Sequence, residues 1–194
     1  MPVRIGVYCG SNLGSTSSHA EHARRMGSAL ARRGFGLVYG GANVGLMGIL
    51  ADAALEHGAE VIGVIPRRLV DVEIAHRGLT RLEVVDSMHE RKALMMELSD
   101  GFVALPGGFG TLDEVFEILT WDQLGLIAKP VVFLDVDGFY SHLFAFLDKA
   151  VDAGFLRGTH RLLAQRALTV DESLALASGP VPDFEHKWID RDPS

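Results

Sequence analysis

Short apolar runs alternate along the chain with longer amphipathic segments. The runs are typical of buried strands, and the longer segments repeat apolar residues at helical spacing, as Leu112, Val115, Phe116 and Leu119 do. This pattern predicts strands at residues 1–8, 36–39, 60–65, 81–85, 102–105, 129–134 and 167–170. It predicts helices at residues 19–33, from the glycine-rich segment 40–48 to about residue 57, and at 87–98, 111–124, 139–153 and 171–177, with a short helical turn at 160–163.

Strands that alternate with helices at this spacing predict an α/β fold. We expect a Rossmann-like, doubly wound, mainly parallel sheet with helices on both faces. Residues 67–80 have no clear period, so we expect a loop with a short helix at the rim of a pocket. The chain has 194 residues, 48% of them hydrophobic, which is enough for one full core. We therefore expect a single nucleotide-binding domain over residues 1–180 and a poorly ordered tail at 181–194.

Glycine-rich corners follow three of the predicted strands, after Tyr8, Tyr39 and Leu105. In a parallel sheet such corners lie at the carboxyl ends of the strands, where ligands bind. The segment 105–114, Leu-Pro-Gly-Gly-Phe-Gly-Thr-Leu-Asp-Glu, leads from a strand into a helix. Glycines let backbone N–H groups approach an anion closely, and the helix start adds unpaired donors and the positive end of its dipole. A phosphate group suits this corner.

A structural interpretation of the same segment stays open at this point. Glycine turns before helices are common, and Thr111 with Glu114 three residues later also fits a capping box. In that arrangement the Glu114 carboxylate would accept a hydrogen bond from the Thr111 amide instead of facing a ligand.

Composition narrows the class of partner. The net charge of −7 and the pI near 5.6 argue against nucleic-acid binding and against anionic membranes. An anionic substrate would therefore need a locally positive pocket. Cys9 is the only cysteine, which fits a reducing compartment, and no apolar run approaches the roughly twenty residues of a membrane helix. We expect a cytoplasmic protein. We predict no metal site, because His19, His22 and His89 lack a recognisable ligand spacing.

Two motifs taken together resemble those of a known family. Residues 106–114, Pro-Gly-Gly-Phe-Gly-Thr-Leu-Asp-Glu, fit the signature PGGxGTxxE, and residues 87–93, Ser-Met-His-Glu-Arg-Lys-Ala, resemble its companion MHxRK. Both are similar to the LONELY GUY family of cytokinin riboside 5′-monophosphate phosphoribohydrolases. Further similar segments lie at 8–11, 38–48, 61–66, 120–125 and 136–140, so the resemblance covers roughly residues 3–165. Ala42 departs from the family pattern, which often has a further glycine there.

The resemblance implies hydrolysis of the N-glycosidic bond of a nucleoside 5′-monophosphate, typically one with an N6-modified adenine. The products are the free base and ribose 5-phosphate, no cofactor is required, and the resemblance also implies a homodimer. Proteins with this signature have also been labelled lysine decarboxylases. A pyridoxal-phosphate decarboxylase needs a Schiff-base lysine in a usually much longer chain, and no lysine here has a convincing context. The rival from another class is a carrier that binds a nucleotide or cofactor without cleaving it.

The resemblance also assigns roles to residues. Cleavage leaves positive charge on the ribose ring, so a carboxylate is needed near the anomeric carbon. Glu114 is the candidate carboxylate, and Arg91 matches the catalytic arginine of the family, whose guanidinium can grip phosphate or ribose oxygens. Glu117, one turn on, could reach the same face, which leaves a two-carboxylate mechanism open. The candidates for substrate or phosphate binding are Glu73, Lys92, Gly107, Gly108, Phe109, Gly110, Thr111, Thr120, Ser11, Gly41 and Met88.

Overall fold

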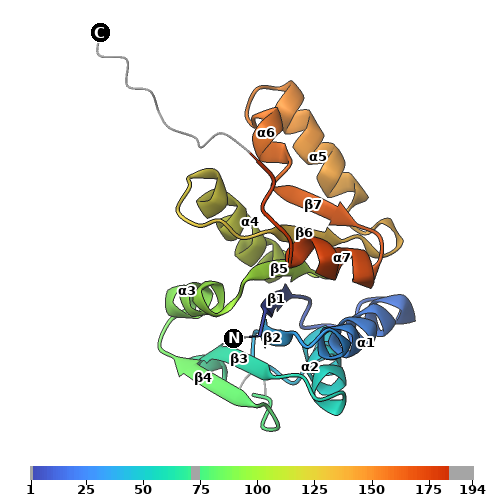
Figure 1. The fold of residues 1–194 in the computed structure, drawn as a ribbon, viewed down its shortest axis with the longest axis vertical. Helices are drawn as coiled ribbons and strands as arrows, with labels where there is room; N and C mark the ends of the chain where they lie inside the picture. Colours follow the sequence, from blue (N-terminus) through green and yellow to red (C-terminus); the bar gives the residue numbers. More distant parts are fainter. Residues whose placement is uncertain (1, 71–74, 184–194) are drawn as a thin grey trace.

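The computed structural model describes residues 2–70 and 75–183, and over this part of the chain seven parallel strands form one sheet. Every strand pair is parallel. The strand order is β4-β3-β2-β1-β5-β6-β7 (Figure 1). The strands are β1 (Arg4–Tyr8), β2 (Gly36–Tyr39), β3 (Val61–Pro66), β4 (Arg81–Val85), β5 (Gly101–Ala104), β6 (Val131–Leu134) and β7 (Ala164–Ala167).

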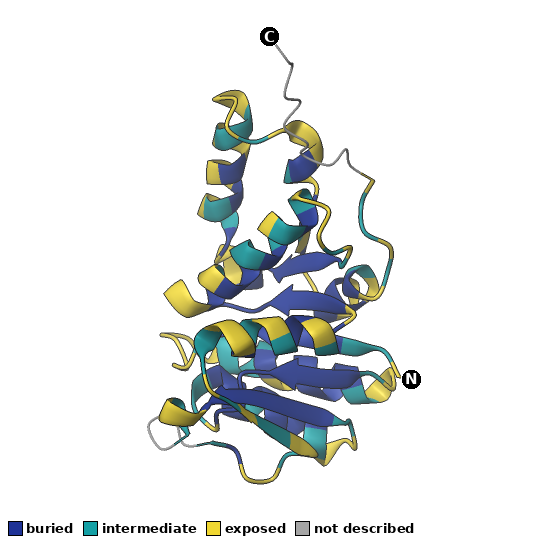
Figure 2. Cartoon of the chain, turned by 90° about the vertical axis from the view of Figure 1, so that its left-hand side faces the viewer, coloured by how far each residue is buried: buried dark blue, intermediate teal, exposed yellow. Residues whose placement is uncertain are grey.

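Helices cover both faces of this sheet, which confirms the predicted Rossmann-like fold. On one face α1 (Ser17–Arg32), α2 (Gly45–Glu56) and α7 (Val170–Ala177) pack into one apolar cluster. On the other face α3 (Met88–Leu98), α4 (Phe109–Gln123) and α5 (Ser141–Asp152) form a second cluster. The remaining helical elements are α6 (Gly158–Arg161) and the 3-10 turns η1 (Arg67–Leu69) and η2 (Val136–Gly138). The strands are buried between these layers, and the helices expose their outer sides (Figure 2).

The order of the strands places a ligand crevice near the middle of the sheet. The chain builds outward from β1 to β4, then returns to lay β5 on the other side of β1. Tyr8 pairs with Ala104 at the carboxyl ends of these two strands. The corners that follow them therefore open on the same side of the reversal point, which is where doubly wound sheets bind ligands.

Two predicted boundaries are wrong, and each has a local cause. Helix α4 begins at Phe109 with Gly108 as its N-cap, so Thr111 lies inside the helix and the capping box is wrong. Strand β7 ends at Ala167, where we expected it to begin. Thr169, which we assigned to that strand, instead caps α7, and its side chain accepts a hydrogen bond from the Glu172 N–H.

Helix α3 starts as predicted. Ser87 is its N-cap, and its hydroxyl accepts a hydrogen bond from the Glu90 N–H at 3.1 Å. Most of the predicted tail, residues 184–194, lies outside the described residues. Among the described helices, none has both the length and the apolar character that a membrane crossing requires.

Candidate active site

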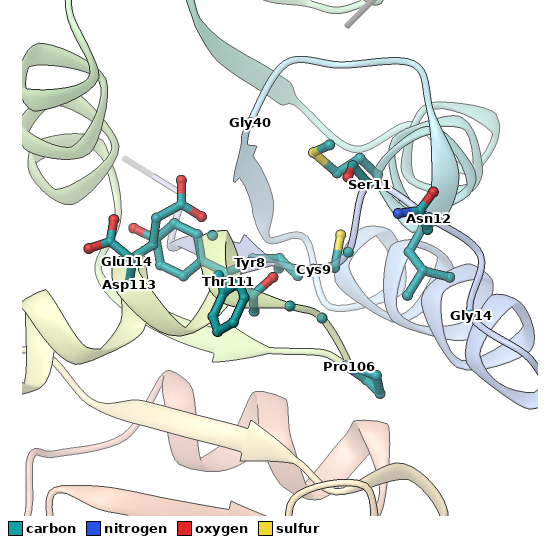
Figure 3. A pocket seen from close by; sticks show the side chains of 18 of the residues that line it. Tyr8, Cys9, Ser11, Asn12, Gly14, Gly40, Pro106, Thr111, Asp113 and Glu114 are labelled. Carbon is teal, nitrogen blue, oxygen red and sulfur yellow. The ribbon is translucent and has the colours of Figure 1, made fainter.

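A cavity of about 410 Å³ lies at the carboxyl ends of β1, β2 and β5, beside the first turns of α3 and α4 (Figure 3). Most of the predicted site residues line it, although they come from distant parts of the sequence. Those that do are residues 107–111, Ser11, Met88, Arg91 and Glu114. The convergence of the corners after Tyr8 and Leu105, expected from the parallel topology, is therefore present in the structure.

The amino end of α4 offers backbone donors to this cavity. Gly108 is the N-cap, no side chain caps the helix, and no acid stands in its first turn. The first hydrogen bond of the helix runs from the Leu112 N–H to the Gly108 carbonyl at 3.1 Å. The N–H groups of residues 109–111 consequently have no acceptor within the helix. A Cβ built on Gly108 or Gly110 would meet no atom within 4 Å, so there is open space for a ligand beside them.

Gly107 has a different role, because it lets two corners touch. A Cβ at Gly107 would lie 2.1 Å from the Thr111 Oγ1 atom and 3.0 Å from the Gly10 nitrogen. The Gly10 N–H also donates a hydrogen bond to the Pro106 carbonyl at 3.0 Å. The loop after β5 is thus closed against both the start of α4 and the loop after β1.

Arg91 and Glu114 form an ion pair across the cavity wall, from α3 to α4. The Arg91 Nη1 atom lies 3.1 Å from the Glu114 Oε1 atom, and the side chains are only 10% and 9% exposed. The Arg91 Nε–H also donates to the Val64 carbonyl of β3 at 3.1 Å. Two charged side chains buried to this extent have lost most of their hydrating water. Their attraction for each other and their hydrogen bonds to nearby polar groups must compensate for that loss, which requires a fixed geometry.

Two groups beside this pair stay protonated at neutral pH. Burial raises the pKa of the Tyr8 hydroxyl well above its ordinary value, and the charge of Glu114 adds to the shift. Burial and the same Glu114 charge raise the pKa of the Cys9 thiol. Since the thiolate is the nucleophilic form of cysteine, Cys9 is not suited to attack a substrate.

Lys92, expected at the phosphate, does not line the cavity. Its Nζ atom lies 3.2 Å from an Asp113 carboxylate oxygen and 3.1 Å from a Glu117 carboxylate oxygen. The lysine therefore ties α3 to α4 behind the Arg91 pair. Glu117 is likewise engaged by this lysine and does not line the cavity.

Three further candidates are placed elsewhere or are not described. Thr120 is exposed, and its hydroxyl donates to the Phe116 carbonyl at 2.7 Å. Gly41 is buried with a φ of 78°, and its carbonyl accepts the His76 N–H instead of facing the cavity. Glu73 lies outside the described residues.

The sequence did not single out several residues that line the cavity. Tyr8 ends the first strand and Cys9 follows it, a position that could have drawn attention to both residues. Gly40 lines the cavity where Gly41 was expected. Met47 and Phe139 come from α2 and from the turn after β6, and although both lie in segments that resemble the family, we predicted no role for them in the site.

Comparison with known proteins identifies the family. The family model described as "Possible lysine decarboxylase" matches residues 47–176. A protein of Oryza sativa subsp. japonica named probable cytokinin riboside 5′-monophosphate phosphoribohydrolase is 46% identical over 171 residues, which cover 88% of this chain and 77% of the relative. A cytokinin riboside 5′-monophosphate phosphoribohydrolase of Arabidopsis thaliana is 42% identical over 189 residues, 96% of this chain and 89% of the relative. The chain belongs to the LONELY GUY family.

A solved structure outside the phosphoribohydrolases shares the fold. The molybdenum cofactor carrier protein of Chlamydomonas reinhardtii superposes with a TM-score of 0.69 at 25% identity, covering 90% of this chain and 95% of that one. The fold is therefore common to LONELY GUY members and to proteins named as carriers.

The lysine positions do not support the decarboxylase description of this LONELY GUY chain. Among the lysines that the structure describes, none lines the cavity. Lys92 is held by two carboxylates, and the Lys129 ammonium donates to two backbone carbonyls of the α3 end at 2.6 Å each. Lys149 lies on α5.

Proposed function

We propose that this chain hydrolyses the N-glycosidic bond of a nucleoside 5′-monophosphate and releases the free base and ribose 5-phosphate. The names of its relatives support a cytokinin riboside 5′-monophosphate, that is, an N6-modified adenosine monophosphate, as the substrate. The observation that carries the proposal is the buried Arg91–Glu114 pair. It lines the same cavity as the amino end of α4, where backbone N–H groups have no acceptor within the helix.

The phosphate occupies the amino end of α4 in this proposal. The N–H groups of residues 109–111 point out of the helix end, and the helix dipole adds partial positive charge there. Gly108 and Gly110 leave the approach unobstructed. This placement fixes one end of the nucleotide and directs the ribose toward the second turn of α4.

Glu114 then acts on the ribose. As the base departs, positive charge develops on the sugar ring, and a carboxylate held close to the anomeric carbon stabilises that charge more in the transition state than in the ground state. Arg91 fixes the Glu114 carboxylate and presents its remaining guanidinium donors to ribose or phosphate oxygens. The base is received by an apolar wall that includes Leu46, Met47 and Met88.

The test is turnover by the purified protein. Incubation with AMP and with N6-isopentenyl-AMP should release free base and ribose 5-phosphate in equal amounts, measured by chromatography. Adenosine, which lacks the phosphate that the α4 amides are proposed to bind, should be cleaved far more slowly. Failure to cleave either monophosphate would contradict the proposal.

The likeness to a molybdenum cofactor carrier supports a second candidate, a non-catalytic carrier of a nucleotide or cofactor. It predicts tight binding of the monophosphate by calorimetry with no release of base. A carrier also has no need of the Arg91–Glu114 pair, so exchanging Glu114 would leave its affinity nearly unchanged.

The homodimer and the cytoplasmic location are part of the same proposal. The family resemblance supports the homodimer, and the single cysteine, which fits a reducing compartment, supports the cytoplasmic location. Light scattering on the purified protein would measure the oligomeric state, and a mass of one chain would contradict the dimer.

A further inference from the structure

Two neighbouring glycines, Gly40 and Gly41, follow β2, and they are glycine for different reasons. Gly41 has a φ of 78°, a conformation that other residues rarely adopt. Gly40 is not among the glycines with positive φ, so its φ gives no reason to exclude a residue with a side chain. Whatever excludes a side chain at Gly40 must therefore be an atom in front of it.

That atom belongs to Arg91. A Cβ built on Gly40 would lie 2.3 Å from the Arg91 Nη2 atom and 3.5 Å from its Cζ atom. The next nearest atom is the Met47 sulfur at 3.1 Å, at the end of a flexible side chain. The Arg91 guanidinium thus rests directly against the backbone of Gly40.

The guanidinium has no room to move away from an added methyl group without losing its partners. Its Nε–H is held by the Val64 carbonyl and its Nη1 atom by the Glu114 carboxylate, each at 3.1 Å. The Arg91 side chain is only 10% exposed, so little of its surface is free beyond the part that lines the cavity. A side chain at Gly40 would displace Nη2, and with it the atom that holds Glu114.

We propose that Gly40 is a positioning residue of the active site, which by lacking a side chain allows Arg91 to reach Glu114. Gly40 lies against the Arg91 Nη2 atom, whereas the bound partners hold the Nε and Nη1 atoms of the same guanidinium. The kinetic consequence rests on the proposed phosphoribohydrolase function. The steric coupling between Gly40 and Arg91 does not.

The kinetic test is Gly40→Ala with Gly36→Ala as the matched control. Gly36 begins β2, the strand that ends just before Gly40, and a Cβ there would meet an arginine stem, the Arg4 Cγ atom, at 3.0 Å, while neither Gly36 nor Arg4 lines the cavity. Displacement of a catalytic group by about 1 Å can cost about 100-fold in rate, so kcat/KM should fall by roughly that factor in Gly40→Ala. Gly36→Ala should keep the wild-type value. Equal kcat/KM in the Gly40 variant and the wild type would overturn the proposal.

A thermal double-mutant cycle tests the coupling without turnover. Gly40→Ala should lower Tm by about 2–4 °C or more in the wild-type background, and by much less in the Arg91→Ala background, where the clash is gone. If Gly40→Ala alone does not fold, the Gly40→Ala/Arg91→Ala double variant should. The same loss of Tm in both backgrounds would refute the steric role of Arg91. Absence of turnover in the wild type would refute the proposed function and leave this cycle intact.

Discussion

Exchange of Glu114 for glutamine is the sharpest single test of the site. Glu114→Gln preserves the shape of the side chain and one carbonyl oxygen, but it removes the charge that faces Arg91 at 3.1 Å. Both side chains are about nine-tenths buried, so water cannot replace the lost carboxylate. Removing one preorganised electrostatic group from a site of this kind costs about 2.7–4 kcal/mol of transition-state stabilisation. We therefore expect kcat to fall by about 100- to 1,000-fold.

The exchange should also lower stability. The glutamine oxygen can still accept one hydrogen bond and Arg91 retains the Val64 carbonyl, but the charge of the buried guanidinium loses its partner, so we expect a loss of about 3 kcal/mol in the free energy of unfolding. Single-turnover release of base measures the chemical step, and urea unfolding measures stability. A variant that keeps wild-type turnover while losing stability would refute a chemical role for Glu114.

Glu117→Gln supplies the matched control on the same helix. It makes the same chemical change one turn further along, where the carboxylate binds Lys92 outside the cavity. Turnover within about threefold of the wild type is expected, because the Glu117 carboxylate does not line the cavity and Lys92 keeps a second partner, the Asp113 carboxylate. A loss as large as that of Glu114→Gln would instead support a two-carboxylate mechanism.

Two further predictions concern buried polar side chains, Asp122 near the end of α4 and Tyr140 beside the loop after β5. Burial raises the pKa of Asp122 to about 6, so the protonated form favours folding below pH 4 and this contribution is lost as pH rises through 6. The stability advantage of Asp122→Asn over wild type should accordingly grow by up to about 3 kcal/mol between pH 4 and pH 7 in urea titrations, and a constant difference would contradict the assigned burial effect. The Tyr140 hydroxyl donates to the Leu105 carbonyl at 2.6 Å, just before the glycine-rich loop at residues 106–108. Tyr140→Phe should cost about 1–2 kcal/mol of unfolding free energy and weaken binding of ribose 5-phosphate measured by calorimetry, whereas unchanged affinity would show that this bond does not hold the loop.

The sheet and its glycine corners could be predicted from the sequence because their signals are local. The local sequence indicates a strand for an apolar run such as residues 131–134, and a turn for a glycine-rich segment. The parallel topology then brings the turns after the strands together. The misplaced seventh strand shows the limit of such signals. Its sequence, Ala-Gln-Arg-Ala, has little strand character, and pairing with β6 decides its position.

The contacts of individual side chains could not be predicted from local sequence signals. Arg91 and Lys92 are neighbours in the sequence, yet they face different partners. Arg91 faces Glu114 in the cavity, whereas Lys92 faces Asp113 and Glu117 and does not line the cavity. Which of the two enters the cavity depends on how α3 is rotated against α4. The sequence motif contains both residues but does not specify that rotation. We therefore predicted that both side chains contact the substrate.

The distribution of charge also changes how phosphate recognition should be understood. We expected an acidic protein to need a locally positive pocket, but the charged side chains that line the described cavity, apart from histidine, are Arg91, Asp113 and Glu114. Arg91 is balanced by Glu114, and Asp113 by Lys92. The side chains therefore supply no net positive charge, and the attraction for a phosphate must come from the backbone amides and dipole at the start of α4. In the proposed function, these fixed partial charges bind the phosphate without a lysine in the cavity, and the Arg91–Glu114 pair acts on the sugar.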